Sequence, residues 1–284
     1  MHNTPQAWIA DSWGKLNDAS PAAVEDAARI LEDLHAMSPA FHEARRRLLA
    51  AAHVGSGTHL LELGCGTMPQ LAETAAQVGR NGSIVGLDYT ERFLQVARER
   101  ARTLGLDQVA FQAGDCRALP FDDATFDAVL ADKLLIHVGP GEGIVAEMLR
   151  VTRPGGWIGA LDWDGEAVLV TCDDPRLARR ILDVNRDQRA CFDAARRAAR
   201  WFGRAGATEI TVAGMLACFT DSANPVMQGL VRRWAERAVA AAAVQPREAD
   251  AWLADVLAPD RPGRLVALPI IVTAGRKPAG DPLS

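Results

Sequence analysis

Lysine is scarce in this chain. Only Lys15, Lys133 and Lys277 occur, and arginine supplies the rest of the 31 basic residues. The 36 acidic residues outnumber the basic ones, which gives a formal net charge of −5. Because non-specific nucleic-acid affinity needs a surplus of cations that face phosphates, this composition argues against a general polyanion binder. We therefore expect no nucleic-acid partner.

Long apolar runs and cysteine pairs are lacking too. No apolar run approaches the roughly 20 residues that a membrane helix needs. The first residues contain no basic stretch followed by an apolar core, so no secretory signal is visible. The five cysteines are an odd number and form no Cys-x-x-Cys pair, so we expect neither a disulfide framework nor a metal site. We predict a cytoplasmic protein that does not insert into a membrane.

An ordinary globular composition is present, with 49% hydrophobic and 24% charged residues. From Leu60 onward, short apolar runs alternate with segments of helical period, as in a parallel sheet covered by helices. The predicted strands are Thr58–Leu63, Ser83–Leu87, Val109–Ala113, Phe126–Ala131 and Trp157–Leu161. Pro154-Gly155-Gly156 predicts a tight turn into the last of these, because proline ends a helix and glycine accepts unusual backbone angles.

The remaining segments predict the domain organisation. Residues 1–54 contain helical patterns at Pro21–Ala36 and Pro39–His53 and are expected to form a lid. Residues 55–276 would form the α/β domain, and 277–284 a flexible tail. Within the domain we predict one long helix over Asp174–Phe202, strands over Glu209–Phe219 and Arg264–Thr273, and a helical cap insertion at about 222–260.

The most informative motif is a strand followed by Glu62-Leu63-Gly64-Cys65-Gly66-Thr67 and then a helix. Glycines let the backbone turn sharply and approach a ligand, and the N–H groups at the start of the next helix face that ligand. A nicotinamide dinucleotide fingerprint needs a third glycine three residues after Gly66, where Pro69 stands. The motif alone permits several nucleotide-binding folds.

Two further positions indicate which ligand this loop would bind. Asp88 ends the second strand, 22 residues after Gly66, where a carboxylate can accept hydrogen bonds from both ribose hydroxyls. The neighbouring Tyr89 would place its ring beside an adenine. After the third strand come Gly114, Asp115 and Cys116. An acidic side chain followed by a backbone N–H can read the edge of an adenine ring, although Gly-Asp is also a common turn pair.

Together with Phe126-Asp127-Ala128-Val129 and Arg150-Val151-x-x-Pro154-Gly155-Gly156, these motifs resemble class I S-adenosylmethionine-dependent methyltransferases, in particular the small-molecule branch of quinone C-methyltransferases and natural-product O-methyltransferases. The resemblance runs from about Thr58 to Asp162. It implies a Rossmann-like α/β fold with a seven-stranded mixed sheet, whose last strand inserts antiparallel between its neighbours. The cofactor would lie across the carboxyl ends of the first strands.

The resemblance also implies roles for single residues. Glu62, Gly64, Cys65 and Gly66 would hold the methionine part of the cofactor. Asp88 would hold the ribose, and Asp115 with Cys116 the adenine. Asp132 and Lys133 follow the fourth strand, where the family turns its backbone toward the cofactor's amino group and sulfonium. The family's third loop glycine is Met68 here, which could narrow the loop or bring a thioether near the cofactor.

Candidate catalytic residues are His137 and Asp162. His137 resembles a histidine that serves as general base in some sugar O-methyltransferases, and an imidazole is suited to that role near neutral pH. In many relatives this histidine only packs or caps the following helix. The segment Asp162-Trp163-Asp164 ends the fifth strand on the ligand side, where one carboxylate would assist the base, position the acceptor, or only solvate a loop.

The predicted function is therefore metal-independent methyl transfer from S-adenosyl-L-methionine to a small-molecule acceptor, with O- or C-methylation favoured. Two alternatives stay open. One is a methyltransferase-like protein that catalyses another reaction, such as a cyclisation, since one fold supports many functions. The other is an NAD(P)-dependent oxidoreductase. The acceptor is not identified by any motif, and a homodimer is left open.

Overall fold

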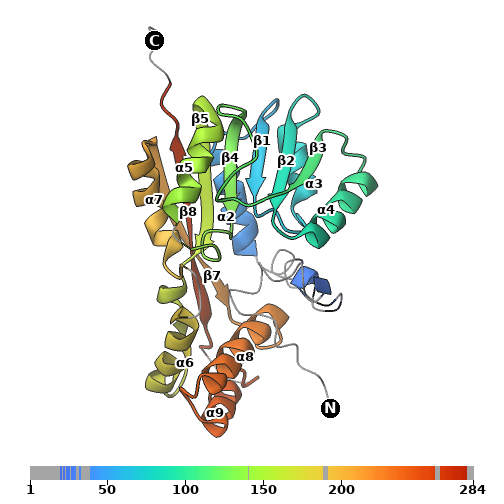
Figure 1. Cartoon of the computed structure of the whole chain (residues 1–284). Helices are drawn as coiled ribbons and strands as arrows, with labels where there is room; N and C mark the ends of the chain where they lie inside the picture. The colour runs from blue at the N-terminus through green and yellow to red at the C-terminus, as the bar shows by residue number, and fades with distance from the viewer. Residues whose placement is uncertain are drawn as a thin grey trace.

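The computed structural model describes residues 20, 22, 24, 25, 27–29, 32, 39–139, 141–187, 191–259 and 263–279. These residues form one mixed sheet with helices packed on it, and three helices extend beyond one end of the sheet (Figure 1). No helix in the described part of the chain is long and apolar enough to cross a membrane.

The sheet has the predicted topology. Its strand order is β3-β2-β1-β4-β5-β8, and β7 pairs with the other side of β8. β1 to β5 run parallel, and β8 is antiparallel to both β5 and β7. The strands are β1 (His59–Leu63), β2 (Ser83–Asp88), β3 (Val109–Ala113), β4 (Phe126–Asp132), β5 (Thr152–Trp163), β7 (Thr208–Phe219) and β8 (Val266–Arg276). A further two-residue strand, β6 (Leu169–Val170), pairs with the start of β8, so the described sheet has one short strand more than predicted.

Two glycines let helices approach both faces of the sheet. Gly159 of β5 pairs with Ala274 of β8, and the adjacent Ile158 pairs with Gly275. Successive strand residues point to opposite faces. A Cβ on Gly159 would lie 2.7 Å from Leu48 of α2 (Pro39–Ala51), and one on Gly275 would lie 3.1 Å from a ring atom of α7 (Ala194–Ala205). The two helices therefore cover opposite faces.

The predicted turn at Pro154-Gly155-Gly156 is part of β5, which begins at Thr152. Gly155 has the expected positive φ of 80°, but its N–H donates to the carbonyl of Lys277. Lys277, the first residue of the predicted tail, also donates from Nζ to the carbonyls of Arg150 and Thr152. These bonds hold the start of the tail against the sheet. Residues 280–284 lie outside the described residues.

The prediction of one helix over Asp174–Phe202 is wrong. The structure has α6 (Pro175–Asp187) and α7 as separate helices. Between them, the N–H of Cys191 donates to the carbonyl of Ile136, and the carbonyl of Phe192 accepts from Gly165. The Phe192 ring lies so close to Gly165 that a Cβ there would be 2.4 Å from it. Contacts with the loops after β4 and β5 therefore draw this segment out of the helix.

The connection from β7 to β8 contains α8 (Pro225–Ala240) and α9 (Pro246–Val256), within the predicted cap insertion. Asn224 caps α8 by accepting from the N–H of Met227 at 3.1 Å. α8 and α9 pack with α6 around the buried Trp234 and Trp252. These three helices, called the cap here, lie at the end of the sheet where β5 finishes (Figure 1).

The remaining described helices include α3 (Leu71–Val78), α4 (Glu91–Thr103) and α5 (Gly141–Val151), each of which follows a strand. α2 is buried along Ala44 and Leu48 and belongs to the hydrophobic core. The predicted lid therefore depends on the residues before 39, most of which lie outside the described residues, and it stays a prediction.

Candidate functional site

The glycine loop stands at the carboxyl end of β1 and is held in a left-handed backbone conformation. Gly64 and Gly66 have φ values of 62° and 56°, a region in which glycine carries no steric cost. A Cβ on Gly64 would lie 2.6 Å from Leu134. The N–H of Cys65 donates to the carbonyl of Leu87, so the loop is tied to the end of β2. Burial and nearby carboxylates raise the pKa of the Cys65 thiol, which is therefore neutral.

Asp88 ties the same loop to β2 through its side chain. One carboxylate oxygen accepts from the N–H of Gly66 at 2.9 Å, and the other accepts from the N–H of Thr90 at 2.8 Å. Burial raises the pKa of Asp88, while these backbone donors act against the shift. The structure thus brings the predicted ribose-binding carboxylate into contact with the predicted cofactor loop.

A buried cluster of charged side chains lies next to the loop. The central residue of this cluster, Arg45, was not predicted as a site residue. Arg45 of α2 donates to both oxygens of Glu62, at 2.9 and 2.5 Å, and to Oδ2 of Asp132 at 3.3 Å. Arg45 and Glu62 are only 3% and 1% exposed. Gln70 adds a hydrogen bond to Glu62 at 2.8 Å. Glu62 therefore anchors β1 to α2 in this structure, and its direct contact with a cofactor stays a prediction.

Asp132 and Lys133 stand at the end of β4, next to this cluster. Lys133 has a positive φ of 56°, and its N–H donates to the carbonyl of Leu161 at 2.6 Å. Its ammonium lies 2.5 Å from Oδ1 of Asp132 and 5.7 Å from the centre of the Phe41 ring. The structure therefore has a turn after β4, as the resemblance implies. The carboxylate of Asp132 in this turn interacts with two cations, Arg45 and Lys133.

The residues predicted to contact adenine lie at the ends of β2 and β3. Tyr89 is 54% exposed. The N–H of Gly114 donates to the backbone carbonyl of Asp88, which joins the two strand ends. Asp115 is held by the guanidinium of Arg117, which lowers the pKa of Asp115. Burial raises the pKa of the Cys116 thiol to about 11, so Cys116 is a neutral side chain beside the site.

The two candidate catalytic residues lie at the ends of β4 and β5. His137 is half-buried in the turn after β4, and its backbone N–H donates to the carbonyl of Leu134. Asp162 is 2% exposed, and its Oδ2 accepts from the N–H of Leu135 at 3.1 Å. Asp162 therefore supports the turn that carries His137. Asp164, the second acidic residue of this segment, is bound by Nε and Nη2 of Arg196.

Asp162 should make the folded protein less stable as the pH rises. Burial, and after it the negative charge of Asp132, raise the pKa of Asp162 well above its ordinary value. The folded state therefore binds this proton more tightly than the unfolded chain. The contribution of this proton to the free energy of unfolding is complete below about pH 4. It is lost as the pH rises toward the folded-state pKa, by about 1.4 kcal/mol for each pH unit between the unfolded and folded pKa values. We expect Asp162→Asn to become more stable than the parent protein at neutral pH.

Urea unfolding at pH 5, 6, 7 and 8 measures this difference. Asp122→Asn is the matched control, because Asp122 is exposed and its replacement should leave the profile of the parent protein unchanged. Parallel stability profiles for Asp162→Asn and the parent protein would show that Asp162 does not take up a proton on folding.

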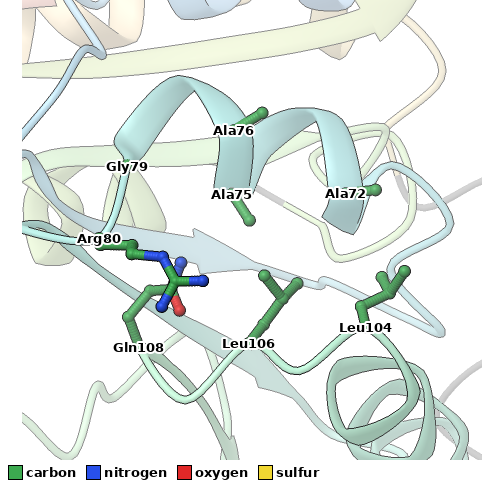
Figure 2. Close-up of a pocket in the computed structure, with 8 residues that line it drawn as sticks. All are labelled: Ala72, Ala75, Ala76, Gly79, Arg80, Leu104, Leu106 and Gln108. Carbon is green, nitrogen blue, oxygen red and sulfur yellow. The ribbon is translucent and has the colours of Figure 1, made fainter.

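A surface pocket in the described part of the chain lies away from all these residues. It is lined by Ala72, Ala75, Ala76, Gly79, Arg80, Leu104, Leu106 and Gln108 (Figure 2). Gly79 and Leu104 follow α3 and α4, and Gln108 precedes β3. The pocket therefore lies at the amino-terminal edge of the sheet, opposite the loop and carboxylates described above. No cluster of three metal-binding side chains occurs among the described residues.

Residues 55–214 match the methyltransferase-domain family. This match covers more than half of the chain, and the chain belongs to that family.

A demethylmenaquinone methyltransferase of Bacillus cytotoxicus is 37% identical over 122 residues, which are 43% of this chain and 52% of that protein. The chain thus spans about half the length of this relative. The YcgJ protein of Bacillus subtilis has a TM-score of 0.59 at 18% identity and covers 84% of this chain and 100% of that chain. The cyclase SpnF has a TM-score of 0.52 at 21% identity and covers 85% and 82%. These two structures show the fold alone.

Proposed function

We propose that this protein transfers a methyl group from S-adenosyl-L-methionine to a small-molecule acceptor. The contact between the Asp88 carboxylate and the N–H of Gly66, at 2.9 Å, carries the proposal. It places a carboxylate suited to ribose hydroxyls directly against a glycine loop suited to the rest of the cofactor. The family membership and the relative from Bacillus cytotoxicus support methyl transfer as the reaction.

The residues around the loop fit this cofactor. The partly accessible Asp88 lies beside Tyr89, whose exposed ring can stack on a planar base. Gly114 and Asp115 border the same place. At the end of β4, Asp132 lies near the loop, and its buried carboxylate is bound by Arg45 and Lys133. We assign the adenosine to the ends of β2 and β3 and the methionine part to the ends of β1 and β4.

When bound, the cofactor supplies an electrophilic methyl group on a sulfonium. The protein's own contribution is chiefly alignment, because holding two reactants in line converts a bimolecular step into an effectively unimolecular one. In this proposal the turn Leu134–His137 faces the acceptor, and Asp162 holds that turn in place. His137 removes the acceptor's proton where the acceptor is a hydroxyl or a weakly acidic carbon.

Calorimetric titration tests the cofactor. We expect S-adenosylhomocysteine to bind and NADH not to bind. Asp88→Ala should weaken S-adenosylhomocysteine binding by at least about tenfold, or roughly 1.4 kcal/mol, because two hydroxyl contacts are lost. Glu91→Gln is the control, since the Glu91 side chain at the start of α4 is 47% exposed and pairs with Arg98, and its replacement should leave the affinity unchanged.

Transfer of a labelled methyl group to small-molecule acceptors tests the reaction itself. Binding of NADH alone would replace this proposal with an oxidoreductase. Binding of S-adenosylhomocysteine together with turnover of an acceptor that gains no label would instead identify a non-methylating enzyme such as a cyclase.

A further inference from the structure

Glu32, which precedes α2 in the chain, contacts the predicted cofactor loop of residues 64–67. Its Oε1 accepts a hydrogen bond from the hydroxyl of Thr67 at 2.8 Å, and Thr67 follows Gly66 directly. Thr67 is completely buried, and a buried hydroxyl is costly unless it has a hydrogen-bond partner. The loop is therefore held by Glu32 on one side, in addition to its contact with Asp88.

Arg100 of α4 binds both partners of this contact. Its Nη1 donates to the carbonyl of Thr67 at 2.6 Å, and its Nη2 donates to Oε1 of Glu32 at 2.7 Å. One guanidinium thus joins the loop to Glu32. The side chains of Arg100 and Glu32 are 24% and 38% exposed, so water partly screens the ion pair and the contact can open. Glu32, Thr67 and Arg100 are called the loop clamp here.

The described residues between 22 and 32 are helical and pack on the protein through one face. Val24 and Ala27 are 6% and 0% exposed, whereas Arg29 is exposed. Val24 and Glu32 are eight residues apart, so they lie on the same side of a helix. Figure 1 shows these residues in dark blue below α4, at the end of the sheet where the cap also lies. Apolar burial therefore holds this segment in place, and Glu32 fixes where it meets the loop.

The loop clamp is connected to Asp88 in two ways. Gly66, the residue before Thr67, donates from its N–H to one carboxylate oxygen of Asp88 at 2.9 Å. The other oxygen accepts from the N–H of Thr90, which precedes α4, and α4 carries Arg100. The predicted ribose-binding carboxylate, the loop and the clamp are therefore one connected set of hydrogen bonds. A ligand that fixes the loop should favour the closed clamp, and the closed clamp should favour that ligand, because such coupling is reciprocal.

We propose that Glu32 and Arg100 position the cofactor loop and slow the release of the bound cofactor. This inference rests on the proposed function for the identity of that cofactor. Glu32 is a positioning residue, because it acts on the ligand through Thr67. Without the clamp the loop keeps its bonds to Leu87 and Asp88 but loses its contact with Glu32. We expect the loss to appear mainly in the dissociation rate, as in most variants of one binding site.

Release of labelled S-adenosylhomocysteine into an excess of the unlabelled compound tests the clamp in the full chain. We expect Glu32→Gln and Arg100→Met each to release the label at least about fivefold faster than the parent protein. The double variant should release it about as fast as Arg100→Met alone, because both changes break the same contact. The controls are Glu25→Gln, which changes an exposed residue of the same segment, and Arg102→Met. The Arg102 side chain is 75% exposed and pairs with Glu99, so both controls should match the parent protein.

Trypsin cleavage after Arg29 is a readout that a merely structural contact would not change. Cleavage within a helix needs local unfolding, so its rate reports how often this segment opens. Because the coupling is reciprocal, S-adenosylhomocysteine should slow this cleavage at least about fivefold in the parent protein and much less in Glu32→Gln. In Glu25→Gln the protection should equal that of the parent protein.

Equal release rates for the parent protein and Glu32→Gln would overturn the proposal, and so would equal protection of Arg29 in these two proteins. The same measurements keep this inference apart from the proposed function. Normal binding of S-adenosylhomocysteine with equal release from all variants removes the clamp alone. A parent protein that does not bind S-adenosylhomocysteine removes the proposed function, and the coupling with it.

Discussion

Arg45→Met should lower the free energy of unfolding by about 3–5 kcal/mol. Arg45 is the cation that the buried carboxylates of Glu62 and Asp132 share, and its Nη2 also donates to Thr74 at 3.2 Å. Methionine fills a similar volume but leaves both carboxylates facing a buried site with one cation fewer. Domains of this kind have a total stability of about 5–15 kcal/mol, so the loss is a large fraction of the whole.

Urea unfolding followed by circular dichroism measures the change, and Arg46→Met is the matched control. Arg46 is the next residue on the same helix, but it is 68% exposed and pairs only with Glu43 among the described residues. Its replacement should change stability by no more than about 0.5 kcal/mol. If Arg45→Met does not fold, Arg45→Lys keeps one charge and should show an intermediate loss. Equal stabilities for Arg45→Met and Arg46→Met would contradict the role assigned to Arg45.

The strands could be predicted because each one has a local signal in the sequence. β3 has the predicted ends, and β1, β2 and β4 differ from their predictions by one residue. β3 is the edge strand and the other three lie inside the sheet, and all four are bounded by glycine or polar residues. β5 begins five residues before the predicted start, because its first residue pairs with Phe126 at the start of β4 and Gly155 bonds to the tail at Lys277. Only tertiary contacts reveal that extension.

Arg45 shows what local patterns omit. It stands within Arg45-Arg46-Arg47, and nothing in such a run marks one arginine as buried. The helical spacing of Phe41, Arg45, Leu48 and Leu49 is a signal that could have placed Arg45 on the buried face of α2. Its partners are 17 and 87 residues away, so their identity depends on the fold.

The break between α6 and α7 has no local signal. No proline or glycine interrupts residues 176–202, and the amphipathic pattern continues across the gap. What ends the helix is the contact of Cys191 and Phe192 with the loops after β4 and β5. Tertiary contacts of this kind override helix propensity. The same contacts join the segment that follows α6 to the turn that carries His137, so the error concerned a segment next to the predicted acceptor region.

His137→Ala should lower kcat by about 10²- to 10⁴-fold, the usual contribution of a general base, once the labelled-methyl assay has identified an acceptor with a hydroxyl or carbon nucleophile. The affinity for S-adenosylhomocysteine should stay within about twofold, because in our proposal His137 faces the acceptor and the cofactor contacts Asp88 and the glycine loop. His137→Gln should behave similarly, because an amide keeps hydrogen bonding but cannot take up the proton.

His59→Ala is the matched control for this variant. His59 starts β1 and lies 2.8 Å from the hydroxyl of Ser83, at the amino-terminal edge of the sheet, so its loss should leave turnover unchanged. A base is needed only while the acceptor must lose a proton, so the deficit of His137→Ala should shrink as the pH rises and the acceptor ionises in solution. Unchanged turnover in His137→Ala would assign His137 to packing of the turn above Asp162, and the proton would then leave without help from this side chain.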